Sequence, residues 1–131
     1  MRRYWDSSAL VDALHDTRVE ALAKEADQWT RYHTLSESFA VLTGGKLGVR
    51  YQPDDAVALL REITATFQFI DLELSEIWFA LENAQKKGVR GGNVHDWLHV
   101  RAAAKAKVSE LLTDNLADFV NLADGFKVIA P

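Results

Sequence analysis

The 131-residue chain contains no cysteine, and this absence removes several kinds of chemistry at once. It excludes disulfide bonds, zinc sites built on thiolates and enzymes with a cysteine nucleophile. The chain also lacks a long apolar run: no stretch approaches the length of a membrane span, and its first residues do not lead into the apolar core of a signal peptide. We therefore expect a cytoplasmic protein that does not enter a membrane.

Basic residues are also fewer than acidic ones. Lys and Arg number 15 against 19 Asp and Glu, so the net charge is −4. This balance argues against a protein that holds nucleic acid mainly by bulk electrostatics. It leaves open an enzyme whose bound cations supply positive charge locally. The 48% hydrophobic content and the length predict one globular domain over residues 1–131 with a sizeable core.

Apolar patterning predicts strands that alternate with helices along the whole chain. Strands are expected at residues 3–5, 29–33, 67–70, 111–113 and 126–129. Helix signals between them are the capping-box pairs Thr17/Glu20 and Thr34/Glu37, the stop Gly44-Gly45, the start Pro53, the stripes Val19/Leu22/Ala23/Ala26, Val57/Leu60/Ile63 and Leu74/Ile77/Trp78/Leu81, and the cap Asn93. The alternation predicts an α/β fold with a mostly parallel sheet of four to five strands and helices on both faces.

Acidic residues recur where the predicted strands end and helices begin, which is the edge where open α/β sheets bind ligands. They are Asp6 after the first strand, Glu37 and Asp96 early in two helices, and Asp114 and Asp118 around the turn after residues 111–113. Each alone could be a cap or a partner of the helix dipole. Carboxylates that converge would repel, by roughly 4 kcal/mol for a pair ~4 Å apart at an effective dielectric of 20. A divalent cation would offset that cost, and oxygen ligands favour Mg²⁺ or Mn²⁺.

Segments in order along the chain resemble the motifs of PIN domains. Asp6-Ser7-Ser8-Ala9-Leu10 is similar to their opening Asp-x-Ser-Ala-Leu, and residues 34–43 to the segment around their motif Glu. Gly91-Gly92-Asn93-Val94-His95-Asp96-Trp97-Leu98 resembles their Gly-Gly-x-x-Tyr-Asp-x-Leu segment. Residues 111–119 resemble their closing Leu-Leu-Thr-x-Asn-x-x-Asp-Phe. The resemblance covers essentially the whole chain.

This resemblance implies a three-layer α/β/α fold and a metal-dependent ribonuclease, most often the toxin of a VapC-type toxin–antitoxin pair. It carries over Asp6, Glu37 and Asp96 as metal-binding acids, with Mg²⁺ or Mn²⁺ as the cofactor. The family often has Asp where this chain has Asn115, so Asp118 is chosen as the fourth ligand, with Asp114 and Asn115 as backups. Ser8 and Thr113 match the family's supporting hydroxyls. The implied partners are an RNA substrate, a cognate antitoxin and a second copy of the chain in a homodimer.

Exposed cations would have to guide an RNA backbone to such a site. Lys46 and Arg50 lie in the predicted loop after the Glu37 helix, and Lys86, Lys87 and Arg90 precede the Asp96 helix. The plainer interpretation of these residues is a solvated surface. If they do contact phosphates, the affinity for RNA should fall with salt.

Other site patterns in the sequence are weaker. His95 and His99 have the i, i+4 spacing of a zinc pair, but the His-Glu-x-x-His motif is absent. Gly44-Gly45-x-x-Gly48 lacks the Lys-Ser/Thr of a P-loop, and Ser7 and Ser8 lack the Gly-x-Ser-x-Gly turn of hydrolases. A phosphatase-like enzyme would need a second Asp two residues after Asp6, where Ser8 stands. The remaining alternative is a PIN-like domain of weak catalysis that acts as an RNA- or protein-binding module. Asn115 and the negative net charge favour this alternative.

Overall fold

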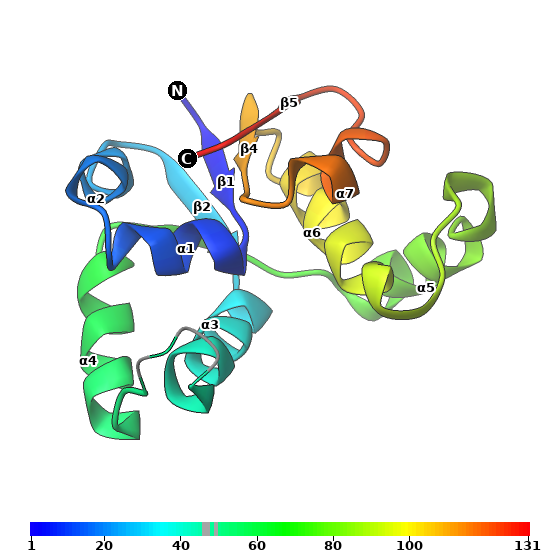
Figure 1. Ribbon diagram of the computed structural model, residues 1–131. Coiled ribbons are helices and arrows are strands. Elements are labelled where there is room, and N and C mark those ends of the chain that lie inside the picture. Colours follow the sequence, from blue (N-terminus) through cyan, green and yellow to red (C-terminus); the bar gives the residue numbers. More distant parts are fainter. Residues whose placement is uncertain (46–47, 49) are drawn as a thin grey trace.

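The computed structural model describes residues 1–45, 48 and 50–131, and its centre is a five-stranded sheet (Figure 1). The strands are β1 (Arg3–Trp5), β2 (Gln28–Arg31), β3 (Gln68–Ile70), β4 (Glu110–Leu112) and β5 (Lys127–Ile129). Their order is β3-β2-β1-β4-β5, and every neighbouring pair is parallel. The predicted α/β class and parallel sheet are confirmed.

Helices cover both faces of this sheet. They are α1 (Ser7–Ala13), α2 (Thr17–Ala23), α3 (Tyr32–Gly44), α4 (Pro53–Ile63), α5 (Leu74–Glu82), α6 (Val94–Lys105) and α7 (Leu116–Val120), with short 3₁₀ turns η1 (Gln85–Lys87) and η2 (Gly91–Asn93). In Figure 1, α1 to α4 lie to one side of the strands and α5 to α7 to the other. Among the described residues, no helix is both long and apolar enough to cross a membrane.

The central strand β1 connects two separate apolar cores. Successive side chains of a strand point to opposite faces, so Tyr4 packs into the cluster with α5, α6 and α7, and Trp5 packs into the cluster with α1 to α4. Leu111 and Leu112 of β4 divide in the same way. The three layers follow from this alternation, and they fix the carboxyl end of β1, where Asp6 stands, between the two helical layers.

The start of α3 differs from the sequence prediction. Tyr32 and His33, expected in a strand over 29–33, form the first turn of the helix, and β2 ends at Arg31. Thr34 is buried inside the helix, so the predicted Thr34/Glu37 capping box is wrong. The strand preference of an aromatic residue depends on its surroundings, and here Tyr32 is exposed and stacks on Phe69 of β3 from the first turn of the helix.

Two other predicted helix caps also differ. Asp16 caps α2 by accepting a hydrogen bond from the backbone N–H of Arg18 at 2.9 Å, so the Thr17/Glu20 capping box is wrong. Because α2 ends at Ala23, Ala26 lies outside it and is exposed. Asn93 does precede α6, but its side chain accepts from the backbone N–H of Arg90 instead of capping the helix.

Some predicted core positions face solvent. Helix α5 forms where expected, yet Leu74, Trp78 and Leu81 are 70%, 56% and 41% exposed, and the helix buries Ala80 instead. Val57 on α4 is exposed while Ala56 is buried beside Leu60 and Ile63, and β3 is an edge strand with Gln68 exposed. The pattern identified the helices correctly, but α5 lies at the edge of the molecule, where α6 covers only one side of it (Figure 1).

Candidate acidic site

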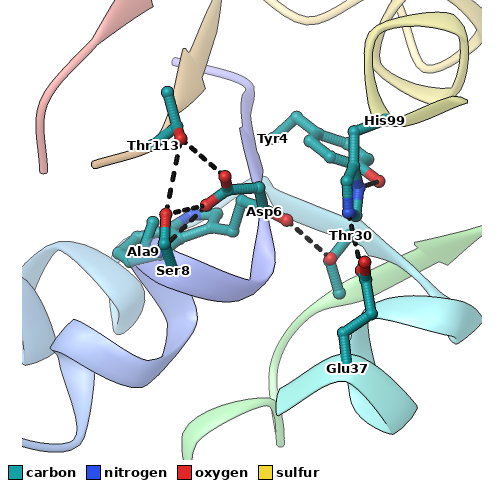
Figure 2. Close-up of polar contacts among 9 residues, drawn as sticks. Tyr4, Asp6, Ser8, Ala9, Thr30, Glu37, His99 and Thr113 are labelled. Atoms are coloured by element: carbon teal, nitrogen blue, oxygen red, sulfur yellow. Dashed lines mark hydrogen bonds and ion pairs between the residues drawn. The ribbon is translucent and has the colours of Figure 1, made fainter. Parts of the chain in front are cut away.

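Asp6 stands at the carboxyl end of β1, and its carboxylate is held from three directions (Figure 2). The Ser8 hydroxyl and the Ala9 backbone N–H donate to Oδ1 at 2.7 and 2.9 Å, and the Thr113 hydroxyl donates to Oδ2 at 2.6 Å. Asp6 is only 3% exposed, and this burial raises its pKa even though the three donors act to lower it. Among the described residues Oδ2 accepts a single bond, so it keeps a lone pair for a further partner.

Glu37 reaches the site from the second turn of α3 and is fixed by a buried histidine. Nε2 of His99 lies 2.7 Å from Oε1 of Glu37, and Nδ1 of His99 lies 2.7 Å from the hydroxyl of Tyr4 (Figure 2). Burial raises the pKa of Tyr4, so its hydroxyl stays protonated. We assign it as the donor to Nδ1, which leaves Nε2–H to donate to Glu37.

This chain of hydrogen bonds orders the Glu37 carboxylate. Burial alone would raise the pKa of Glu37, but the hydrogen bond from His99 outweighs it, with smaller contributions from His33 and Arg31, and the pKa is lowered. Glu37 is therefore kept ionised and pointed by a group from another helix. Its role in a capping box, the plain alternative, is excluded by its position in the second turn.

Asp96 lies near the other predicted acids. It lies in the first turn of α6, where burial raises its pKa and the carboxylates of Asp118, Asp6 and Glu37 raise it further, against the effect of His99. Asp118 lies in the first turn of α7 and is exposed. The carboxylates of Asp6, Glu37 and Asp118 are thus close enough to Asp96 to disfavour its charged form.

The backup residues occupy the turn after β4. The backbone N–H of Asp114 donates to the Ser8 hydroxyl at 3.0 Å, and that of Asn115 donates to the Thr113 hydroxyl at 3.0 Å. Ser8 and Thr113 thereby hold both Asp6 and this turn. The Asp114 carboxyl is hydrogen-bonded to Asp12 of α1, away from the set that acts on Asp96.

The Asp12/Asp114 pair makes stability depend on pH. Burial, the hydrogen bond with Asp114 and the charges of Asp114, Asp6 and Asp16 raise the pKa of Asp12 to about 7. An unfolded Asp titrates near about 3.9, so between these values the folded state holds the extra proton. This stabilising contribution is complete below about pH 4 and is lost as the pH rises through about 7.

We therefore predict that Asp114→Asn flattens the fall in melting temperature between about pH 5 and about pH 8. Asp12 is only partly buried, so solvent screening limits the difference from the native protein to a few degrees. Thermal unfolding by circular dichroism measures it, with Asp54→Asn on exposed α4 as the matched control. An unchanged pH slope in Asp114→Asn would contradict the shared proton.

The donor chemistry of the site suits a hard divalent cation, because every predicted ligand offers carboxylate oxygen. Across residues 1–45, 48 and 50–131, however, no three His, Asp or Glu side chains converge closely enough to hold a metal ion as they stand. Glu37 is held to His99 and Asp6 to Ser8 and Thr113, and the uncompensated carboxylates repel. A cation would have to draw these side chains together.

Basic residues predicted to guide RNA are exposed, whereas the predicted zinc pair of histidines does not form. Arg50 is exposed, and Lys86, Lys87 and Arg90 are exposed around η1 and η2, just before the Asp96 helix; Lys46 lies outside the described residues. His99 uses both ring nitrogens on Tyr4 and Glu37. His95 is exposed and faces the ring of His33, with centroids 6.0 Å apart. The two histidines therefore do not form a zinc pair.

Sequence reasoning missed His99, Tyr4 and Arg31 as members of this site. His99 is 2% exposed in an otherwise apolar stretch of α6, and Arg31 is buried at the end of β2. A polar or charged residue in a buried stretch needs a partner, and that was the signal available in the sequence. The partners themselves lie 95 and 62 positions away from His99.

Comparison with known proteins bears on the fold. No family model matches the chain, and no curated protein matches its sequence. PAE2754 from Pyrobaculum aerophilum superposes with a TM-score of 0.70 over 98% of this chain and 89% of its own, at 13% identity. VapBC2 from Rickettsia felis, bound to a DNA fragment from their promoter, gives a TM-score of 0.71 over 99% and 98%, at 19% identity. The chain has a VapC-like PIN fold.

At these identities the likeness concerns the PIN fold alone. The chemistry of the acidic site therefore has to be argued from the residues of this chain. Those residues stand where β1, β2 and β4 end and α1, α3 and α6 begin, which is the ligand-binding edge of an open parallel sheet.

Proposed function

We propose that this chain is a Mg²⁺- or Mn²⁺-dependent endoribonuclease that hydrolyses RNA phosphodiester bonds. The observation that carries the proposal is that Asp6, Glu37 and Asp118 lie near enough to Asp96, at the carboxyl edge of the sheet, for their charges to raise its pKa. Such mutual repulsion costs stability and is offset when a cation binds. The PIN-like fold and the motif resemblance support the same reaction.

Each residue has a distinct task in this proposal. Asp6, Glu37 and Asp96 would hold the cation, with Asp118 as fourth ligand. A bound Mg²⁺ would lower the pKa of its water and offset charge on the leaving oxygen. Ser8, Thr113 and His99 orient the carboxylates, and Asp96 or Asp118 accepts the proton of the attacking water, a task that suits the raised pKa of Asp96.

The proposed partners follow from the same site. RNA would approach over the exposed Lys86, Lys87 and Arg90, so its affinity should fall with salt. A cognate antitoxin would lay a segment across the mouth of the site and place an Arg or Lys on the carboxylates. Support comes from the solved VapBC2 complex and from the groove between α3 and α4, lined in part by Leu35, Phe39 and Leu60, beside the helix that carries Glu37. We further propose a cytoplasmic homodimer.

A second candidate is a PIN-like module that binds RNA or protein with little catalysis. The observation in its favour is that no three acids converge within the described part of the chain, together with Asn115 at a position where the family often has Asp. The two candidates differ in one measurable respect, because a binding module has no need of a divalent metal for its activity.

The deciding experiment is cleavage of tRNA with Mg²⁺, with Mn²⁺ and with EDTA, comparing the native protein with Asp96→Asn. The substitution keeps the shape of the side chain and removes one charged ligand. We expect cleavage that requires metal and disappears in the variant, while the exposed control Asp124→Asn cuts normally. Equal activity of Asp96→Asn and native protein would overturn the proposed site. RNA binding without cleavage would favour the binding module.

A further inference from the structure

Arg31 carries a buried positive charge whose donors are not used within the described chain. It ends β2 and is 7% exposed, yet its Nε and Nη1 are buried and make no hydrogen bond to the residues that the structure describes. It also forms no ion pair within 4.0 Å with any described acid. A buried donor without a partner is costly, and more so on a charged group. Such an arrangement is typical of a residue that binds a ligand.

The position of Arg31 indicates which ligand. Strands β1 and β2 are parallel with Tyr4 opposite Trp29, so Arg31 stands at the level of Asp6 at the carboxyl edge of the sheet. Its charge lowers the pKa of both Tyr4 and Glu37. The guanidinium therefore lies near Tyr4 and Glu37, in a site that is otherwise acidic.

We propose that Arg31 binds a non-bridging oxygen of the RNA phosphodiester that enters the acidic site. This inference rests on the proposed function and adds an anion-binding residue to it. Carboxylates repel a phosphate, whereas the planar guanidinium offers directed donors that match phosphate oxygens. With the acids engaged by a cation, Arg31 is the buried positive side chain left at this edge of the described sheet for the phosphate.

The competing interpretation is that Arg31 only balances the charge of Glu37 and Asp6. The two interpretations predict different effects of removing its charge. If Arg31 is only a counter-ion of the acids, its positive charge repels the metal ion, so removing it should tighten metal binding and leave RNA affinity unchanged. If Arg31 binds the phosphate, removing its charge should weaken RNA binding without weakening metal binding.

The test uses the full chain with a short fluorescein-labelled single-stranded RNA, and Ca²⁺ in place of Mg²⁺ to limit hydrolysis. Fluorescence anisotropy is measured for native protein, Arg31→Gln, Arg31→Lys and the exposed control Arg18→Gln, and Mn²⁺ affinity is measured for each by calorimetry. We expect Arg31→Gln to bind RNA roughly ten- to hundredfold more weakly, since a bond to a charged group is lost. Arg31→Lys should recover part of that loss, and Arg18→Gln should bind as the native protein does.

The salt dependence gives a second readout. The slope of log affinity against log salt should become shallower by about one phosphate contact in Arg31→Gln. Unchanged RNA affinity with tighter Mn²⁺ binding would overturn the proposal in favour of the counter-ion, and so would native protein that binds no RNA. RNA binding that depends on Arg31 in a protein that never cleaves would keep this inference and reject the ribonuclease. Melting curves show whether each variant is folded.

Discussion

Asp6→Asn is expected to abolish metal-dependent cleavage, by about a thousandfold or more, and yet to leave the metal-free protein at least as stable as the native one. The loss of activity follows because a charged ligand of the proposed cation is removed, and metal assistance is worth several kcal/mol in the transition state. The retained stability follows because burial disfavours the charged form of Asp6, whose pKa it raises. A neutral amide avoids that cost.

The sign of the pH dependence makes this prediction specific. A raised pKa means that the native carboxyl stabilises the fold when protonated and loses that contribution as the pH rises through the folded pKa. Asp6→Asn should therefore gain stability relative to native protein as the pH rises in EDTA. Adding Mg²⁺ or Mn²⁺ should raise the melting temperature of native protein only. Urea unfolding at several pH values, with and without metal, measures both effects.

A destabilised metal-free Asp6→Asn would show that the bonds from Ser8, Ala9 and Thr113 outweigh the burial of the charge. Thr113→Val is the companion variant, since it deletes the 2.6 Å bond and keeps the carboxylate. It should lose stability where Asp6→Asn does not, by about 1 kcal/mol. Opposite signs for the two substitutions would establish that Asp6 is kept for its charge and not for the fold.

His99→Leu is the second substitution with a large expected effect. It removes both 2.7 Å bonds, so the fully buried Tyr4 hydroxyl is left unsatisfied and Glu37 is released. The unsatisfied hydroxyl should cost about 1–3 kcal/mol of stability. Loss of an orienting partner of a metal ligand typically lowers activity or metal affinity by about 10–100-fold.

A double substitution separates these two effects. Adding Tyr4→Phe to His99→Leu removes the orphaned hydroxyl, so stability should partly return while activity stays low, because Glu37 still lacks its donor. His95→Leu, on the exposed side of the same helix, controls for the general effect of the change on stability. If the double variant regained activity together with stability, His99 would be a packing residue and not an orienting one.

The fold could largely be predicted from the sequence because short apolar runs and helix signals alternate along it. The errors have local physical reasons. Asp16 and Thr17 are adjacent capping residues, and only the backbone geometry decides between them. The stripe of Leu74, Trp78 and Leu81 has the spacing of a buried helix face, but a pattern cannot reveal that nothing in the described chain covers that face of α5.

Only part of the acidic site could be predicted from the sequence. Junction positions and motif spacing identify Asp6, Glu37 and Asp96, since each stands next to a recognisable start of a helix. The residues that orient them come from elsewhere: His99 acts on Glu37 across 62 positions, and Thr113 acts on Asp6 across 107. Such pairs depend on the order of strands in the sheet, which periodicity does not specify.

The first strand of the chain is the middle strand of the sheet, and this has a consequence for how the molecule is made. Arg3 pairs with Gln28 on one side but with Glu110 on the other. At about 5–20 residues per second of synthesis, β1 waits roughly 5–20 s for its second neighbour. During that time one edge is open to pairing with other chains. The acidic site assembles only after Asp96 and Thr113 have been added, so a nascent chain carries no formed site until residue 113 has been synthesised.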